Sequence, residues 1–248
     1  MKSLTAGSLA ALALTLAGCG DEGSGNGAAS APAKNVPLQQ IAAPNGDWTQ
    51  VVTQTPEGGF MMGNPNAPVK VVEFGSMTCG ACAAFSQEGE PQLVQKYVKS
   101  GQVSFEFRNF VRDAADIAAA LLARCNGPSA FFPLTDQLFA AQREWLGKLQ
   151  ELPPEQLQQM QTAGPQAAPI AFQGAGLDQF ARLRGIPAAK AQACVSDQAQ
   201  LQRLVDMGQS AVREFNVSGT PTFLVNGRVS DAGADWAKLE SEIQAALQ

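Results

Sequence analysis

The chain has 248 residues, of which 17 are Lys or Arg, 22 are Asp or Glu, 5 are Cys and none is His. This length suits one or two globular domains, and an apolar fraction of 45% is normal for a protein with a packed core. A net charge of −5 argues against a nucleic-acid partner, and the lack of histidine excludes imidazole catalysis and His-ligated metal sites.

The N-terminal residues predict export. Lys2 precedes an Ala- and Leu-rich run that is too short to span a membrane. Leu16-Ala17-Gly18-Cys19 resembles the lipobox of bacterial lipoproteins, which implies a signal peptide at residues 1–18 and a lipid anchor on Cys19. Gly20, which replaces the aspartate of the inner-membrane sorting pattern, favours the outer membrane. The alternative is a plain secretory signal that is cut nearby.

The next segment predicts a flexible tether. Residues 19–47 consist mainly of Gly, Ala, Ser, Asn and Pro and contain few side chains that a core would bury. We therefore expect the folded part to begin near Trp48.

Strand patterns follow Trp48. Trp48–Val52 and Phe60–Met62 flank a Thr-Pro-Glu-Gly-Gly turn, which predicts a hairpin. Val69–Phe74 is apolar on both faces apart from Lys70 and Glu73, which predicts a mostly buried strand.

The rest of the chain alternates between helices and strands. We expect a helix from Cys79 to about Ser100 and a strand at Gln102–Phe110, followed by a helical block from Asp113 to about Phe215. Within that block, Leu149–Gln173 has little apolar periodicity and predicts a loop with a short helix. The chain then predicts a strand at 222–225, a tight turn at Asn226-Gly227 and a final amphipathic helix with Trp236, Leu239 and Ile243.

Cys79-Gly80-Ala81-Cys82 lies where the buried strand leads into a helix. At this spacing the two sulfurs share one helical face and can form a disulfide. The helix N-terminus favours the thiolate and lowers the pKa of Cys79, so Cys79 is the expected reactive sulfur and Cys82 the resolving one.

Two other interpretations of this motif remain. The cysteines could form half of a zinc site, but the remaining ligands would then have to be Cys125 and Cys194 or carboxylates. They could also form a purely structural disulfide, although such a short loop provides little entropic stabilisation.

From Trp48 to Gln248 the chain resembles the DsbA-like branch of the thioredoxin superfamily. The resemblance rests on the strand before Cys79-Gly80-Ala81-Cys82 and on Gly219-Thr220-Pro221-Thr222-Phe223 far downstream. It implies an α/β fold, thioredoxin-like but interrupted by a helical insertion: residues 48–112, the insertion 113–215, and residues 216–248. It further implies a cis bond before Pro221, which faces the dithiol, and a backbone at Thr220 that pairs with a substrate strand.

The resemblance also assigns a role to Glu73. In this family a buried acid lies near the second sulfur, and burial would raise the pKa of Glu73 and let it accept the proton of Cys82. A solvated carboxylate at the strand end is the alternative. Met77 and Thr78, which flank the dithiol, are candidate substrate contacts. Gly80-Ala81 replaces the Pro-His of the best-known oxidases, so we expect a pKa for Cys79 between about 3.5 and about 8.5 and a less oxidising couple.

Cys125 and Cys194 both lie in the helical block. Exported proteins rarely leave two thiols free, so we predict a structural disulfide that closes a loop of about 70 residues and contributes about 4 kcal/mol in the chain-entropy model. Some DsbA-like proteins carry such a bridge, and two buried free cysteines are the alternative.

The expected function is that of an exported, lipid-anchored thiol–disulfide oxidoreductase in the periplasm. It would act on cysteine pairs of other exported proteins, use no cofactor or metal beyond its own dithiol, and be recycled by a membrane or soluble redox partner. The alternative is a non-catalytic binding or metal-handling lipoprotein with the same fold.

Overall fold

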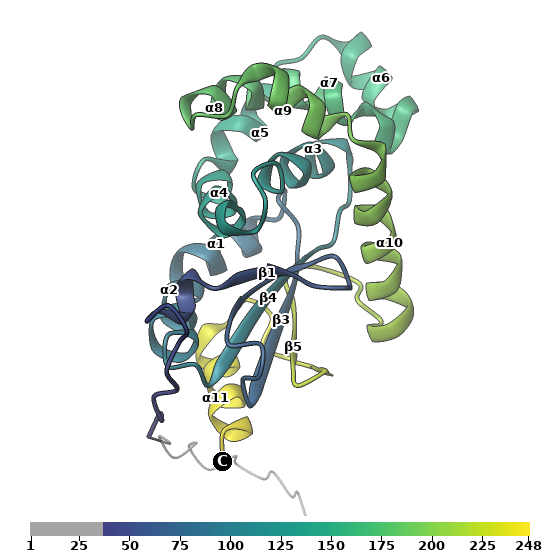
Figure 1. Cartoon of the computed structure of the whole chain (residues 1–248). Coiled ribbons are helices and arrows are strands. Elements are labelled where there is room, and N and C mark those ends of the chain that lie inside the picture. The colour runs from purple at the N-terminus through teal and green to yellow at the C-terminus, as the bar shows by residue number, and fades with distance from the viewer. Residues whose placement is uncertain (1–36) are drawn as a thin grey trace, which may run out of the picture. The chain divides into compact units, whose positions relative to one another are not determined.

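The computed structural model describes residues 37–248 (Figure 1). The predicted signal peptide of residues 1–18, the predicted lipidation site Cys19 and most of the predicted tether lie outside the described residues. Within the described range, no helix combines the length and the apolar character needed to cross a membrane.

The end of the predicted tether is attached to the folded domain. The N–H of Ile41 donates to the carbonyl of Ser100 at 2.8 Å, and the indole N–H of Trp48 donates to the carbonyl of Ile41 at 2.7 Å. Leu38 also packs against the core. The predicted tether boundary at Asp47 is therefore too late, because the composition of this segment hides two apolar residues that attach it to the domain.

A mixed sheet forms the centre of the fold, with the strand order β1-β2-β4-β3-β5-β6. Strands β3 and β4 pair in parallel, and the other neighbours are antiparallel. The strands are β1 (Val52–Gln54), β2 (Phe60–Gly63), β3 (Val69–Gly75), β4 (Val103–Asn109), β5 (Thr222–Val225) and β6 (Arg228–Val229).

Alternation along the strands separates two buried layers. Phe105, Phe107 and Phe223 belong to the main core, whereas Val72 and Phe74 form a smaller cluster with Ala211 and Val217. Glu73 pairs with Phe107 on one side and with Phe223 on the other, so its side chain points to the same face as these two aromatic rings. The strand register therefore explains why a carboxyl group is buried in the main core.

Most of the helices form one group next to the sheet (Figure 1). Figure 1 shows α3–α9 clustered together and α10 running back beside the sheet. The helices are α1 (Gly80–Glu88), α2 (Glu90–Gln92), a π-helical segment (Leu93–Val98), α3 (Ala114–Ala123), α4 (Pro128–Ala140), α5 (Gln142–Gln150), α6 (Pro154–Ala163), α7 (Ala168–Gly174), α8 (Leu177–Leu183), α9 (Ala188–Val195), α10 (Gln198–Phe215) and α11 (Trp236–Ala246).

Three predicted elements differ from the structure. The predicted helix from Cys79 to Ser100 is interrupted after Glu88, since Pro91 has no N–H to continue the helical hydrogen bonds and instead lies in the first turn of a new segment. The predicted loop at Leu149–Gln173 is largely helical, because Pro154 starts α6 and the Gln-rich sequence after it favours a helix. In the predicted hairpin, Trp48–Gln50 is a 3-10 turn and the strand begins only at Val52.

Aromatic stacking joins the helical block to the sheet. The ring of Phe131 on α4 stacks on Phe60 of β2 with ring centroids 4.2 Å apart, and it also contacts Phe107 of β4. Phe131 is fully buried. Together with the contacts of Phe132 with Phe105 and of Phe139 with Phe107, this side chain therefore anchors α4 on the sheet.

We expect Phe131→Ala to lower the free energy of unfolding by about 3–5 kcal/mol, the usual cost of a cavity of this size. Urea denaturation followed by circular dichroism measures the loss. Leu183→Ala is the control, since Leu183 is 77% exposed and its truncation should cost less than about 0.5 kcal/mol. A loss below about 1 kcal/mol for Phe131→Ala would show that the stack does not join the two parts.

Candidate active site

The dithiol lies at the junction of β3 and α1. Cys79 is the N-cap residue of α1, and its sulfur accepts the N–H of Cys82 at 3.3 Å. Cys79 is 6% exposed, whereas Cys82 is fully buried one turn deeper, and both cysteines are free thiols. The structure therefore holds a reduced pair in which only the first sulfur reaches the surface.

A loop from the far end of the chain covers this sulfur. The Thr220–Pro221 peptide bond is cis, and the thiol of Cys79 donates to the carbonyl oxygen of Thr220 at 3.2 Å. These two residues are 141 positions apart in the sequence. The fold thus brings together the dithiol and the proline loop, which are the two motifs on which the resemblance depends.

The environment separates the acidities of the two thiols. Hydrogen bonding with the Cys82 thiol, aided by the backbone N–H groups of Cys82 and Ala81, outweighs desolvation and lowers the pKa of Cys79 to about 5. The same hydrogen bond to Cys79, together with burial and the nearby charge of Glu73, raises the pKa of Cys82. Cys79 is therefore the more acidic thiol of the pair, and Cys82 retains its proton.

Glu73 lies beneath the dithiol with only 1% of its surface exposed. Its Oε1 atom accepts no hydrogen bond from the described residues. Burial, followed by the charges of Cys79 and Asp136, raises the pKa of this carboxyl group well above its usual value. The structure thus places Glu73 in the protein interior and not at a solvated strand end.

Two further carboxyl groups, those of Glu90 and Asp136, interact electrostatically with Glu73. Glu90 on α2 is buried, and burial together with the charges of Asp136 and Glu73 raises its pKa. Asp136 on α4 accepts a hydrogen bond from the Ser86 hydroxyl at 3.4 Å, and burial raises its pKa to about 6. The sequence gives no signal for these two groups, because they come from separate helices.

Met77 is one of the two positions predicted to contact a substrate, and its side chain is 0% exposed in this structure. Its backbone makes a contact that sequence reasoning missed, since the carboxylate of Asp116 accepts the N–H of Met77 at 2.7 Å. Thr78 is partly exposed, and its hydroxyl accepts a hydrogen bond from Arg112 at 2.7 Å.

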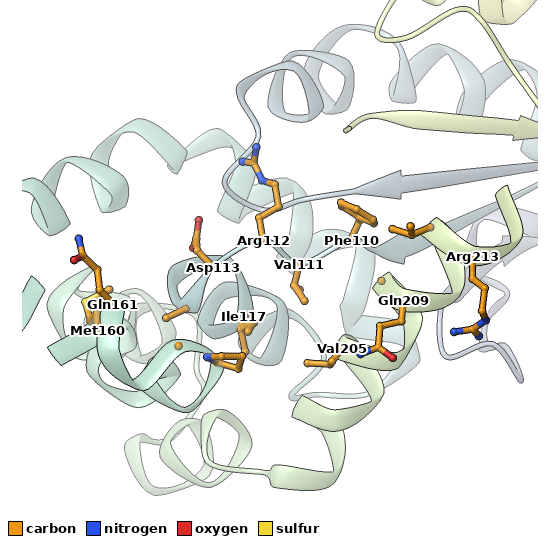
Figure 2. A pocket seen from close by; sticks show the side chains of 15 residues that line it. Phe110, Val111, Arg112, Asp113, Ile117, Met160, Gln161, Val205, Gln209 and Arg213 are labelled. Carbon is orange, nitrogen blue, oxygen red and sulfur yellow. The ribbon is translucent and has the colours of Figure 1, made fainter. Parts of the chain in front are cut away.

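Two adjoining clefts lie in the helical block, and one of them reaches the residue before the dithiol. This cleft has a volume of about 700 Å³, and its lining includes Thr78 and Arg112. The other, of about 840 Å³, lies between the segment after β4, α3, α6 and α10, as Figure 2 shows. Both clefts share a set of lining residues, namely Arg112, Asp113, Ala114, Met160 and Gln161. The two clefts are therefore continuous, and Thr78 lies at the end nearest to Cys79.

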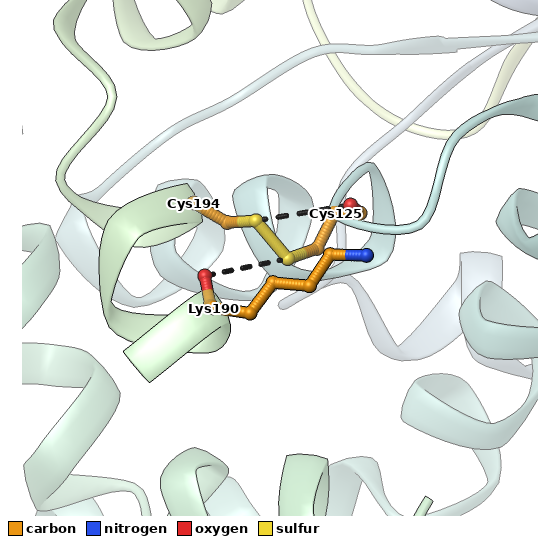
Figure 3. The surroundings of a disulfide bond; sticks show 3 residues. All are labelled: Cys125, Lys190 and Cys194. Carbon is orange, nitrogen blue, oxygen red and sulfur yellow. Dashed lines mark hydrogen bonds between the residues drawn. A yellow bond between two sulfur atoms is a disulfide. The ribbon is translucent and has the colours of Figure 1, made fainter. Parts of the chain in front are cut away.

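The remaining two cysteines form a disulfide in the helical block (Figure 3). Cys125 follows α3 and Cys194 lies in α9, with an S–S distance of 1.96 Å. These sulfurs are therefore not available as metal ligands, which contradicts the zinc site that would combine them with Cys79 and Cys82.

The acidity of Cys79 has a direct consequence for its chemistry. Because its pKa is lowered to about 5, the alkylation rate of the reduced protein should rise through pH 5 and level off near pH 7, whereas an ordinary thiol titrates near pH 8.5. Iodoacetamide labelling at a series of pH values, with the label located by peptide mapping, measures the midpoint. Cys82 should stay unlabelled in the Cys79→Ser control, since its side chain is fully buried. A midpoint near 8.5 or near 3.5 would contradict this prediction.

Comparison with known proteins agrees with this geometry. A putative protein-disulfide oxidoreductase of Rickettsia prowazekii is 26% identical over 182 residues, which cover 72% of this chain and 58% of that protein. The match thus spans less than two thirds of the relative's length. Among solved structures, the protein-disulfide isomerase from Novosphingobium aromaticivorans is 34% identical with a TM-score of 0.71, and the match covers 76% of this chain and 96% of that one.

A more distant structure has the same fold. α-DsbA1 of Wolbachia pipientis is 19% identical with a TM-score of 0.60, over 75% of this chain and 89% of that one. A family model described as thioredoxin matches residues 55–245. These matches confirm the predicted fold class, a thioredoxin-like fold interrupted by a helical insertion, and the chain belongs to the thioredoxin family.

Proposed function

We propose that this protein is an exported thiol–disulfide oxidoreductase that exchanges disulfides with cysteine pairs of other exported proteins through Cys79 and Cys82. The observation that carries the proposal is the position of the Cys79 sulfur, at the N-terminus of α1 and 3.2 Å from the Thr220 carbonyl. The helix end stabilises a thiolate, and the loop leaves a backbone beside it with which an extended substrate can pair.

The exchange takes place in two balanced steps. In the reducing direction, the Cys79 thiolate attacks one sulfur of a substrate disulfide, a mixed disulfide forms, and the other substrate sulfur leaves as a thiolate. Cys82 then loses its proton and attacks the Cys79 sulfur. The bond between Cys79 and the substrate breaks, the substrate is released as a thiolate, and the Cys79–Cys82 disulfide remains. Oxidation of a substrate dithiol is the reverse sequence.

Glu73 is the proposed proton acceptor and donor for Cys82. The charge on Cys79 helps to keep Glu73 protonated, and this charge disappears when Cys79 enters the mixed disulfide. The pKa of Glu73 then falls, and its carboxylate becomes a base for the Cys82 thiol. In the opposite direction the protonated Glu73 supplies the proton that the departing Cys82 thiolate needs.

The substrate is proposed to lie across Thr220, Pro221 and Thr78. Thr220 provides backbone groups beside the sulfur, and Thr78 lines the cleft next to it. The pKa of Cys79, about 5, lies above the value of about 3.5 in DsbA, so we expect a less oxidising couple.

The cellular setting of the proposal rests on the N-terminal sequence. Leu16-Ala17-Gly18-Cys19 supports export to the periplasm and a lipid anchor on Cys19, with the outer membrane as the expected site. A lipid anchor would keep the domain at a membrane surface, where it would meet exported substrates and a redox partner that recycles the dithiol. The proposed reaction uses no cofactor beyond the dithiol.

Cys79→Ser should reduce disulfide exchange to the uncatalysed rate, because a hydroxyl cannot form the mixed disulfide. Insulin reduction by dithiothreitol and refolding of a reduced, denatured protein measure the two directions. The matched variant Cys82→Ser keeps the attacking sulfur and should accumulate mixed disulfides visible on non-reducing gels. Exchange that persists in Cys79→Ser, or tight metal binding by the wild-type protein without any exchange, would contradict the proposed function.

Glu73→Gln should slow the resolution of mixed disulfides by about 10²-fold, which is at the lower end of the usual contribution of a general acid or base. Stopped-flow measurement of mixed-disulfide decay isolates this step. Glu106→Gln is the control, since Glu106 is a buried strand carboxylate that pairs with Arg108 on the other face of the sheet. An unchanged decay rate in Glu73→Gln would remove Glu73 from the mechanism.

A further inference from the structure

Side chains from the helical insertion hold the loop that leads into the dithiol. Asp116 on α3 accepts the N–H of Met77 at 2.7 Å and the hydroxyl of Ser76 at 2.5 Å. Asp116 is fully buried, and the segment from Ser76 to Cys79 is also closed by a hydrogen bond from the N–H of Cys79 to the carbonyl of Ser76 at 3.1 Å. The loop is therefore held partly by a side chain from outside the sheet.

Gln142, the first residue of α5, holds the same loop from the opposite side. Its Nε2 group donates to the carbonyl of Met77 at 2.8 Å and to the carbonyl of Cys79 at 2.9 Å. Gln142 is buried, and an amide nitrogen has two protons, one for each of these acceptors. The side chain thus binds the backbone of the residue that carries the reactive sulfur.

This contact affects the sulfur in two ways. The carbonyl oxygens of Met77 and Cys79 are negative ends of dipoles close to the thiolate, and a donor that binds them lowers their negative potential there. The same bonds fix the Met77–Thr78 and Cys79–Gly80 peptide units and thereby keep the sulfur of Cys79 in the N-cap position, where it accepts the N–H of Cys82 at 3.3 Å. Both effects favour the thiolate over the thiol.

We propose that Gln142 is a positioning residue through which the helical insertion increases the acidity of Cys79. The helical insertion then affects the reactivity of Cys79 directly, in addition to forming the clefts near the dithiol. The inference rests on the proposed function for its biological meaning, but its test uses the acidity of the sulfur and needs no turnover.

The test compares two substitutions at one position. Gln142→Leu removes both donors, and we expect the midpoint of Cys79 alkylation to rise by about one pH unit, a tenfold loss of thiolate below the midpoint. Gln142→Glu keeps the shape of the side chain but places an acceptor and a negative charge against the two carbonyls, so its midpoint should rise further. Each variant should also shift the equilibrium with glutathione toward the disulfide by about the same factor as its thiolate loss.

Gln137→Leu is the matched control. Gln137 on α4 also donates through Nε2 to a backbone carbonyl, that of Pro133 at 2.9 Å, but on the exposed side of the helix. Its removal should leave the Cys79 midpoint unchanged. Urea denaturation of each variant tests whether the midpoint is measured on folded protein, and Gln142→Glu carries the test if Gln142→Leu does not fold.

Unchanged midpoints in folded Gln142→Glu or Gln142→Leu would overturn the inference, and so would a midpoint lower in Gln142→Glu than in the wild type. The proposed function fails separately, through exchange that persists in Cys79→Ser. A shifted midpoint in the Gln142 variants would support the positioning role in either case.

Discussion

The hydrogen bonds at the Cys79 sulfur are the interaction on which the site depends. The sulfur accepts the N–H of Cys82 in the first turn of α1 and lies 3.2 Å from the Thr220 carbonyl. The first contact requires the chain to turn from β3 directly into a helix. The second requires β5, which pairs with β3, to begin just after the proline loop. The sheet topology therefore builds the reactive centre, and the backbone N–H groups of Ala81 and Cys82 adjust the acidity of its sulfur.

The different surroundings of the two sulfurs account for the difference in acidity between Cys79 and Cys82. Above the dithiol, N–H donors favour negative charge on Cys79. Below it, Glu73 and Glu90 are buried, and desolvation is the largest cause of their raised pKa values, so the interior is adapted to protonated carboxyl groups. In the proposed mechanism, Glu73 exchanges a proton with Cys82, whose pKa its charge affects.

The sequence was informative where function depends on neighbouring residues. A buried strand followed by Cys79-Gly80-Ala81-Cys82 predicts the helix N-terminus and the order of reactivity, and Asn226-Gly227 predicts the turn between β5 and β6. The predicted helix from Cys79 to Ser100 did not include the interruption after Glu88, because its apolar periodicity continues past Pro91. The sequence could not predict how the loop at Met77 is held, because its partner Asp116 lies 39 residues away. The contact of Gln142 with the same loop could not be predicted for the same reason. Contacts made across the fold leave no periodic signal in either partner.

Helix α3 is secured at both ends. Asp116 in its first turn accepts the N–H of Met77 in the loop before Cys79, and Cys125, two residues beyond the end of the helix, is covalently joined to Cys194 in α9. The disulfide therefore ties α9 to the C-terminal end of the same helix whose N-terminal end holds the loop. Reduction of the bridge would remove this covalent constraint.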